Sequence, residues 1–296
     1  MIIRKLETSE DKNWDRYVLS NKHSTFYHLS GWKNIISKSY GLKPNYLIAS
    51  SSTGLRGVLP LFIINSRLFG NKIISIPFCT YGGPLSDSLS ISDELIKKID
   101  EINSSKNYYV ELRSTEESLL KSYQVFDNYK TLVLELDEDY ETIWEKKLNK
   151  KVRNSTRNAI RSGLEHHSNI EYLNDFYNLY LNSNKKFGTP HHSFDFFRNI
   201  CLSFPNNVTI EVVSLKDKII AAMFCFWFKE TVTSVWASSD SDYLAYSPNN
   251  LLYWNVIKKG CKKSYKFFDF GRSIESSGTF SFKKAWGSEV KKLYYY

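Results

Sequence analysis

The stretch FFDFGRSIESSGTFSFKKAWGSE, residues 267–289, is the most informative part of this 296-residue chain. Its first residues are apolar and aromatic, which is typical of a buried strand. Gly271 breaks that strand into a Ser/Gly loop, and a basic, aromatic segment then starts a helix. A weaker version of the same signals occurs in the first half of the chain, so the two halves can be compared.

Both halves repeat one order of predicted elements: three strands, a helix and a strand. In the first half these elements are predicted as two strands within 46–64, a strand at 71–78, a helix at 90–103 and a strand at 108–114. In the second half they are predicted at 208–228 (two strands), 231–238, 249–261 and 267–273. A period of about half the chain indicates tandem duplication of one domain, because solenoid repeats are only about 20–50 residues long. The predicted fold class is α/β, an α+β mixed sheet with helices on both sides.

The junction between the two domains is predicted near a basic segment. Residues 141–163 have apolar side chains at helical spacing, with Lys147, Lys151 and Arg157 on the other faces. This pattern predicts an amphipathic helix that is either a solvated surface or a contact for a polyanion. The predicted domains are 1–145 and 146–296, and the last strand, 290–296, is expected to return to the first domain.

The composition narrows the classes of partner and the cellular compartment that we expect. The net charge of +9 favours an anionic partner such as nucleic acid, a phosphorylated substrate or a membrane face. The longest apolar run, residues 219–228, is about half of what a membrane-spanning helix needs. The N-terminus has no signal-peptide pattern, so we expect a cytoplasmic protein, with contact at the inner membrane face left open. The histidine and cysteine spacings do not match a zinc site, and no metal is predicted.

Several motifs together carry a resemblance to a known family. They are TFYHLSGWKNIISKSYG (25–41), GVLPLFIINSRLFGNKIISIPFCTYGGPL (57–85), KKVRNSTRNAIRSGL (150–164), FGTPHH (187–192) and the C-terminal stretch quoted above. With the strand order, they resemble the FemAB-like family of peptidoglycan- and exopolysaccharide-associated aminoacyltransferases, within the GNAT-type N-acyltransferases. The resemblance implies two tandem GNAT-like (acyl-CoA N-acyltransferase) domains. It also implies an amine that attacks an activated acyl carbon, aminoacyl-tRNA as donor, and a cell-envelope or polysaccharide precursor as acceptor.

The C-terminal stretch supplies the candidate catalytic residues. Acyl transfer needs positive charge or N–H donors near the developing oxyanion, and Lys283 and Lys284 are the candidates for that charge. Asp269 is a candidate base or orienting group, with a structural carboxylate as the alternative. The planar fork of Arg272 suits a phosphate or carboxylate. Further substrate-binding candidates in this stretch are Ser273, Phe282 and Trp286.

Other candidate substrate contacts come from two loops. Gly188 and Pro190 define a turn that presents His191 and His192, with Tyr180 on the preceding helix. A histidine there is a candidate for orienting or deprotonating the acceptor amine, and two exposed loop histidines are the alternative. The resemblance further implies an acceptor pocket near Tyr81 and Trp32.

Two other functions remain open at this level. The first is a coenzyme A-dependent N-acetyltransferase that acts on an amino sugar, with acetyl-CoA as donor. GNAT domains hold the diphosphate of that donor on a helix N-terminus. Here the loop 244–250 has no glycine or arginine, and Pro248 removes one N–H donor. The second is a polyanion-binding protein that keeps the fold without the chemistry.

Overall fold

The computed structural model describes residues 1–67, 70–117 and 123–296. It divides the chain into two compact units, one made of Met1–Tyr129 with Lys292–Tyr296 and the other of Lys130–Lys291. The predicted boundary at 145 therefore differs from the observed division. The reason is strand β10 (Tyr129–Glu135), which precedes the basic segment and joins the sheet of the second unit.

Within its described residues, the first unit contains two four-stranded sheets and one strand pair, in the orders β1-β3-β4-β7, β2-β5-β6-β8 and β17-β9. Its strands are β1 (Ile2–Lys5), β2 (Lys43–Pro44), β3 (Leu47–Ser51), β4 (Gly54–Leu59), β5 (Phe62–Ser66), β6 (Gly70–Ile74), β7 (Leu85–Ser86), β8 (Tyr109–Glu111), β9 (Arg113–Ser114) and β17 (Tyr294–Tyr295). Its helices are η1 (Thr8–Glu10), α1 (Asp11–Ser20), η2 (Phe26–His28), α2 (Gly31–Tyr40) and α3 (Leu89–Asn103).

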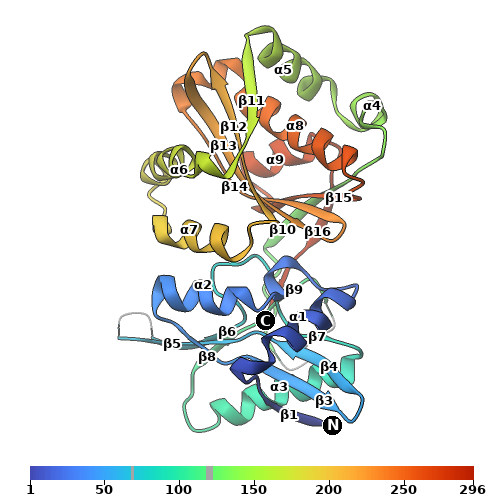
Figure 1. The fold of residues 1–296 in the computed structure, drawn as a ribbon, viewed down its shortest axis with the longest axis vertical. Coiled ribbons are helices and arrows are strands. Elements are labelled where there is room, and N and C mark those ends of the chain that lie inside the picture. Colours follow the sequence, from blue (N-terminus) through green and yellow to red (C-terminus); the bar gives the residue numbers. More distant parts are fainter. Residues whose placement is uncertain (68–69, 118–122) are drawn as a thin grey trace. The chain divides into compact units, whose positions relative to one another are not determined.

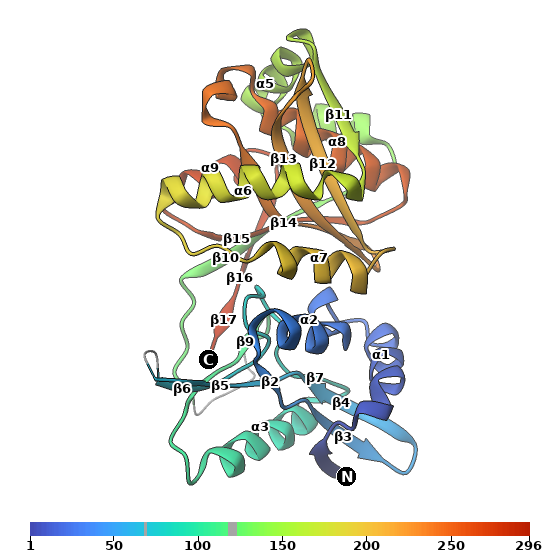
Figure 2. The ribbon, with the colours of Figure 1, turned by 60° about the vertical axis from the view of Figure 1, so that its left-hand side comes forward.

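Helices cover both faces of these sheets (Figure 2). On one face, Leu95 and Ile99 of α3 are fully buried against strand residues that include Leu59. On the other face, the Trp14 ring of α1 lies 4.9 Å from the Tyr46 ring. Along β3, Leu47 and Ala49 belong to the core that contains α3, and Ile48 between them is also fully buried, because successive side chains of a strand point to opposite faces.

The second unit is built on a seven-stranded sheet in the order β11-β12-β13-β14-β15-β10-β16. The strands after β10 are β11 (Leu164–Ser168), β12 (Val208–Leu215), β13 (Lys218–Phe228), β14 (Thr231–Ser239), β15 (Phe267–Ile274) and β16 (Glu289–Lys292). The helices are α4 (Tyr140–Thr142), η3 (Ile143–Lys147), α5 (Lys150–Arg161), η4 (Ile170–Tyr172), α6 (Leu173–Phe187), α7 (Phe194–Ser203), η5 (Ser241–Tyr246), α8 (Pro248–Lys262) and α9 (Gly278–Lys284).

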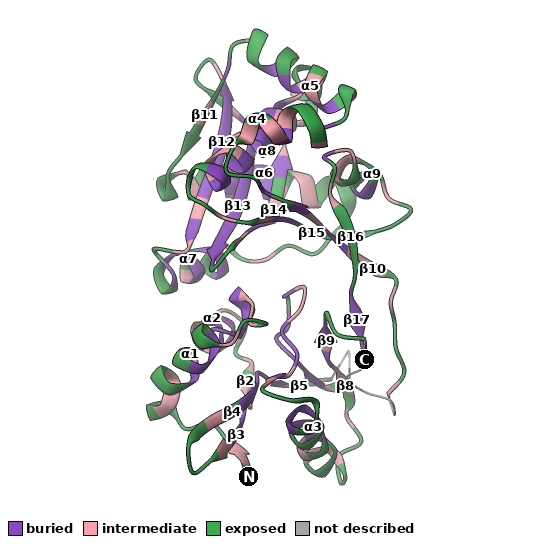
Figure 3. Ribbon diagram, turned by 90° about the vertical axis from the view of Figure 1, so that its right-hand side faces the viewer, coloured by how far each residue is buried: buried purple, intermediate pink, exposed green. Residues whose placement is uncertain are grey.

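Helix α8 lies on one face of this sheet, and α6 and α7 lie on the other (Figure 1). Strand β13 serves both cores because successive side chains point to opposite faces. Met223 and Cys225 belong to the core that contains α8, whereas the ring of Phe224 lies 5.4 Å from Phe176 of α6. The central strands β12 to β15 are accordingly mostly buried, and the outer sides of the helices are exposed (Figure 3).

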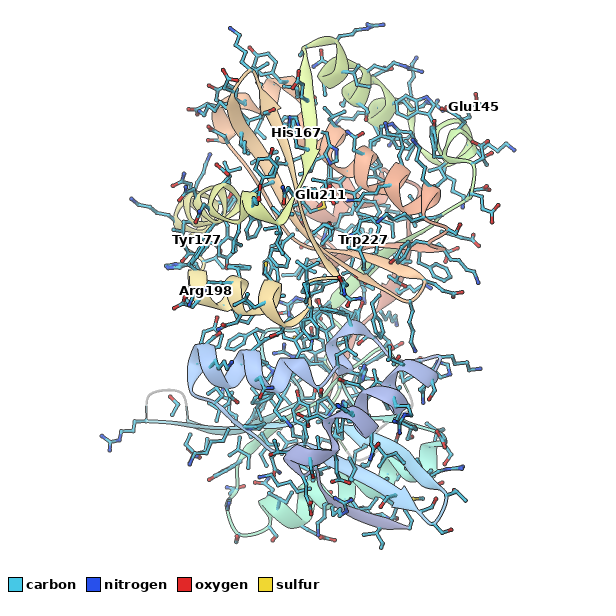
Figure 4. The ribbon with its side chains drawn as sticks, viewed as in Figure 1. Glu145, His167, Tyr177, Arg198, Glu211 and Trp227 are labelled. Carbon is cyan, nitrogen blue, oxygen red and sulfur yellow. The ribbon has the colours of Figure 1, made fainter. Side chains whose placement is uncertain are left out.

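A buried polar network joins β11, β12 and α8. Glu211 of β12 (labelled in Figure 4) has Nζ of Lys259 at 2.8 Å and Nε2 of His166 at 3.0 Å. Burial by itself would raise the pKa of Glu211, but the close contact with His166 and the charge of Lys259 outweigh it and lower that pKa to about 2. We infer a structural network, because its charges are satisfied within the protein.

The predicted duplication is visible in the strand pairing. In both units the first two strands of the repeat are antiparallel, and the strand after the helix pairs in parallel with the third strand. These parallel pairs are β6 with β8 and β14 with β15. One detail differs from the prediction: the second strand of the first half is interrupted at Pro60, and its two parts, β4 and β5, belong to different sheets. Proline has no N–H for a central ladder, so it ends β4.

Two predicted elements at the ends of the second unit are also divided. The helix expected over 141–163 is interrupted at Leu148, where the backbone is extended. A new helix, α5, begins after Asn149, and the side chain of Asn149 caps it by accepting from the N–H of Val152. The last strand is split into β16 in the second unit and β17, which pairs with β9. The last residues, Lys292–Tyr296, thus belong to the first unit.

Candidate active site

The parallel pair β14 and β15 separates after three residue pairs. Thr233 and Asp269 form the last pair of the register, although both strands continue. Two local features accompany this separation. Val235 has no partner in the β13–β14 register, which marks a bulge. Gly271 has φ of +74°, and a side chain there would lie 2.8 Å from the carbonyl oxygen of Ser234. The parallel register therefore ends before the carboxyl ends of the two strands, and the glycine lets their backbones approach closely there.

A cavity of about 410 Å³ lies beyond these strand ends, within the range of small-molecule sites. Its walls come from the end of β14, η5, the first turns of α8, the last turns of α6 and one face of α9. The lining residues used below are Lys186, Ser238, Tyr253, Thr279, Phe282 and Lys283. Most of the polar groups are hydroxyls, and two lysines supply positive charge.

The short helix α9 directs Lys283 into this cavity. Ser277 caps the helix by accepting from the N–H of Phe280 at 3.1 Å. Residues three and four apart share a helix face, so Thr279, Phe282 and Lys283 line the cavity together. Lys284 falls on another face, where it is exposed and its ammonium lies 5.9 Å from the Phe280 ring. Of the two candidate lysines, the geometry therefore selects Lys283.

The ammonium of Lys283 is held by two backbone carbonyls. Its Nζ donates to the oxygen of Gly271 at 3.0 Å and to that of Arg272 at 3.1 Å. A lysine ammonium has three N–H donors, so a third remains for a substrate oxygen. Burial lowers the pKa of Lys283 to about 8, the charge of Asp269 opposes this shift, and the charge of Arg272 adds to it. The group is charged at neutral pH and titrates just above it.

Asp269, Arg272 and Ser273 do not line the cavity. The Asp269 carboxylate is buried and accepts from the hydroxyl of Thr131 at 2.5 Å and from the N–H of Gly271 at 2.8 Å. This placement favours the structural alternative, in which Asp269 fixes the backbone that holds Lys283. The Arg272 side chain is exposed. The hydroxyl of Ser273 is buried and has no hydrogen-bond partner among the described residues.

The two aromatic candidates, Phe282 in α9 and Trp286 just after it, have different positions. Phe282 lines the cavity, as expected for a substrate contact. Trp286 instead is fully buried, with ring centroids of Tyr253 at 6.0 Å and Phe270 at 6.1 Å. Trp286 is a core residue, and its predicted contact with substrate is not supported by this placement. Spacing within the motif did not distinguish the two faces of so short a helix.

His192 and Tyr180 belong to an aromatic cluster outside the cavity lining. The N–H of His192 donates to the Tyr180 hydroxyl at 3.0 Å, and the His192 ring lies 4.4 Å from Phe196. Burial, with the neighbouring charge of His191, lowers the pKa of His192 to about 4, so the ring is neutral and packs as an aromatic. His191 is thus exposed, as the alternative expected, whereas His192 is partly buried, and neither histidine lines the cavity.

The first unit has a cavity of its own, of about 300 Å³. Tyr81, Gly82 and Gly83 line it together with residues that include Arg113. The Tyr81 ring packs edge-on against Tyr27 at 5.4 Å. Trp32, in contrast, is fully buried and donates its indole N–H to the carbonyl oxygen of Phe26 at 3.0 Å. Trp32 is therefore a core residue rather than a pocket wall.

The three predicted polyanion contacts also differ in position. Lys147 is engaged within the protein, because its Nζ donates to the carbonyl oxygen of Glu135 at 2.8 Å. Lys151 and Arg157 lie on the exposed side of α5, and the Arg157 guanidinium covers the Trp144 ring at 5.3 Å. Val152 and Ala159 form the buried side of the same helix.

Sequence reasoning missed several cavity residues, among them Tyr253, Ser238, Thr279 and Lys186. One signal pointed to part of this set, since ligands in open α/β sheets bind outside the carboxyl ends of strands, where Ser238 lies. Tyr253 and Lys186 lie on helices, and only the packing of those helices shows which of their faces meets the cavity. Among the described residues there is no cluster of three His, Cys, Asp or Glu side chains that is suited to a metal ion. The described helices include none that is long and apolar enough for a membrane span.

Comparison with known proteins agrees with this geometry. The family model "Acetyltransferase (GNAT) domain" matches residues 146–284. The crystal structure of FemX is similar over 100% of this chain and 97% of its own, with a TM-score of 0.72 and 13% identity. L-PGS from Bacillus licheniformis is similar over 100% and 92%, with a TM-score of 0.63 and 15% identity. A tandem GNAT protein from the clavulanic acid biosynthesis pathway is similar over 100% and 98%, with a TM-score of 0.61 and 9% identity.

At such identities the likeness to solved structures concerns the fold, and no curated protein matches the sequence significantly. The family match covers most of the second unit, including β14, α8 and Lys283. The structural likeness extends over both units. Residues 146–284 therefore match the GNAT acetyltransferase domain, and the whole chain shares its fold with FemX and with the tandem GNAT protein.

Proposed function

We propose that this protein transfers an aminoacyl group from an ester donor, of the kind carried by a charged tRNA, to an amine of a cell-envelope or polysaccharide precursor. The observation that carries the proposal is Lys283. Lys283 lines a cavity at the ends of β14 and β15, and two backbone carbonyls fix its ammonium. Fixed positive charge beside a carbonyl carbon stabilises the oxyanion that forms when an amine attacks.

The residues of the cavity support the binding of an acyl donor with few charges. Ser238 and Thr279 offer hydroxyls for a short polar acyl group, and Phe282 offers an apolar wall. Lys186 is exposed at the last turn of α6 and suits a phosphate of the donor. In this arrangement the ammonium of Lys283 contacts the acyl carbonyl oxygen, and the exposed Lys186 contacts the rest of the donor.

The GNAT fold implies coenzyme A as an alternative donor, and the residues present do not fit its diphosphate. Such a group needs free N–H donors at the start of the helix that follows the third strand of the repeat. Here Pro248 occupies the start of α8 and has no N–H, and the N–H of Asn250 already donates to Ser247. The short helix η5 fills the preceding connection, without a glycine or an arginine. We therefore expect an ester donor and not coenzyme A.

The acceptor is proposed from the resemblance, with support from the first unit. The cavity around Tyr81 is lined by hydroxyls that include those of Thr25, Ser88 and Ser114. Hydroxyl groups with an aromatic wall suit a sugar-containing precursor that carries the amine. FemX is the solved structure that motivates an envelope precursor, and L-PGS is a second similar fold.

A donor competition tests the proposed function. The purified protein is incubated with a pool of amine acceptors and either a mixture of charged tRNAs or acetyl-CoA. We expect consumption of the aminoacyl ester and formation of an amide product, with no thiol released from acetyl-CoA. Thiol release without consumption of charged tRNA would contradict the proposed donor. If neither donor supports transfer, the result would favour the alternative function, in which the protein binds a polyanion without catalysis.

The exposed basic side of α5 gives a separate prediction. Changing Lys151 and Arg157 to glutamate reverses two positive charges that lie opposite the buried side of the helix. Binding to unfractionated tRNA should weaken, and the log–log salt slope should flatten by about one unit for each lost phosphate contact. The measurement is the dissociation constant at several salt concentrations, with circular dichroism as the control for folding. An unchanged slope would assign this surface to solvation alone.

A further inference from the structure

We propose that Tyr295 of β17 is a positioning residue for the cavity of the first unit, and that it sets how tightly this cavity binds the acceptor. The inference rests on the proposed function, which places a sugar-containing acceptor in this cavity. Tyr295 is not one of the described residues that line the cavity. Instead it contacts Thr80, which precedes the wall residue Tyr81, and Arg113, the first residue of the wall 113–116.

The two walls meet through the backbone of Arg113. Its carbonyl oxygen accepts from the N–H of Gly82 at 3.2 Å, and a Cβ added to Gly83 would lie 2.8 Å from the same oxygen. The strand that contains Arg113, β9, is only two residues long, and β17 lies beside it as its antiparallel partner, with Tyr295 opposite Arg113 (Figure 3). So short a strand has little stability without a partner, so β17 fixes this wall of the cavity.

The side chain of Tyr295 joins the two walls a second time. Its ring lies 5.2 Å from the guanidinium carbon of Arg113, within the range of a cation–π contact. The same ring lies 5.1 Å from the ring of Tyr129, and only 6% of Tyr295 is exposed. Its hydroxyl donates to the carbonyl oxygen of Thr80 at 2.7 Å. One buried side chain thus connects Arg113 with the start of the opposite wall.

Arg113 passes this restraint on to the loop before Tyr81. Its Nε donates to the carboxylate of Glu111 at 2.7 Å, and its Nη1 donates to the carbonyl oxygen of Cys79 at 2.5 Å. Its charge is thus paired within the protein, and the guanidinium serves as a fixed part of the wall. Binding sites lose affinity when the residues that support their walls are loosened. Removal of the Tyr295 ring should therefore weaken binding of the acceptor although Tyr295 does not touch it.

Substitution of Tyr295 by leucine tests this role with two readouts. In steady-state kinetics with charged tRNA as donor and amino sugars as probe acceptors, glucosamine among them, the acceptor KM should rise by about tenfold, equivalent to about 1.4 kcal/mol. The KM for the charged tRNA should change less than about threefold, because the donor is proposed to bind in the second unit. Amide hydrogen exchange, which needs no substrate, should become faster in residues 79–83 and 111–116.

Tyr294→Leu is the matched control, because the neighbouring tyrosine of β17 belongs to the core that contains α3. Tyr294 is as buried as Tyr295, so we expect a comparable loss of thermal stability but an acceptor KM within about threefold of the wild type. Tyr295→Phe keeps the ring beside Arg113 and loses only the bond to Thr80. Its acceptor KM should lie between those of the wild type and Tyr295→Leu.

The outcomes separate positioning from plain stability. Equal increases of the acceptor KM in both leucine variants would overturn the role of Tyr295, as would an unchanged acceptor KM or unchanged exchange in Tyr295→Leu. If Tyr295→Leu does not fold, Tyr295→Phe decides, and an acceptor KM equal to that of the wild type overturns the role. A wild type that transfers to none of the amino sugars would instead refute the proposed acceptor.

Discussion

Replacing Lys283 by methionine should reduce turnover by about 10²–10³-fold, the usual loss when one oxyanion donor is removed. Methionine keeps most of the volume of the lysine stem but has neither charge nor N–H. The two carbonyls that now accept from Lys283 lose that donor, so we expect a stability loss of about 1–3 kcal/mol. Steady-state kinetics with the authentic donor and acceptor measures turnover, and chemical denaturation measures stability.

Lys284→Met is the matched control for this variant. It removes the same charge from the next residue, which is exposed and does not line the cavity. We expect turnover within about threefold of the wild type, because surface substitutions usually change little. If Lys284→Met lost as much activity as Lys283→Met, the selection of Lys283 by geometry would be wrong.

The pKa of Lys283 adds a pH dependence with a defined sign. The protonated form stabilises the oxyanion, and its population falls as pH rises through about 8. Turnover should therefore decline by about tenfold per pH unit well above that value. The residual activity of Lys283→Met should lack this decline. A wild-type rate that keeps rising to pH 10 would show that the charged form is not the active one.

Replacing Trp286 by alanine should destabilise the second unit by about 3–5 kcal/mol, the usual cost of removing a buried tryptophan. Trp286 is fully buried, and Tyr253, Phe270 and Phe282 surround its ring at about 6 Å. The cavity left behind would release the rings that hold Tyr253 in place. The measurement is the midpoint of urea unfolding, in which a change without a change of slope reports stability.

Trp286→Phe provides the graded control, since it keeps one aromatic ring in the same core and should lose less stability than alanine. Both variants should lose stability before they lose affinity for substrate. An alanine variant with unchanged stability and a raised KM would restore Trp286 as a substrate contact and contradict its assignment to the core.

The sequence predicted the repeat and the candidate lysines because these depend on local signals. Alternating apolar residues and turns mark strands, and the glycine before FKK marks the end of β15. The choice between Lys283 and Lys284 was beyond the sequence. Neighbouring residues on a helix point about 100° apart, and only the packing of Phe280 and Trp286 decides which of the two enters the cavity.

By itself, the sequence determined that this chain has two related units of mixed sheet and a basic, aromatic segment after the last strand of the repeat. Tertiary structure decided which side chains share the cavity, since Lys186, Ser238, Tyr253 and Lys283 come from four separate elements. It also decided that Trp32 and Trp286 are core and that Asp269 is bound to Thr131. The physical reason is that burial and hydrogen bonding depend on neighbours distant in sequence, whereas periodicity reports only on neighbours along the chain.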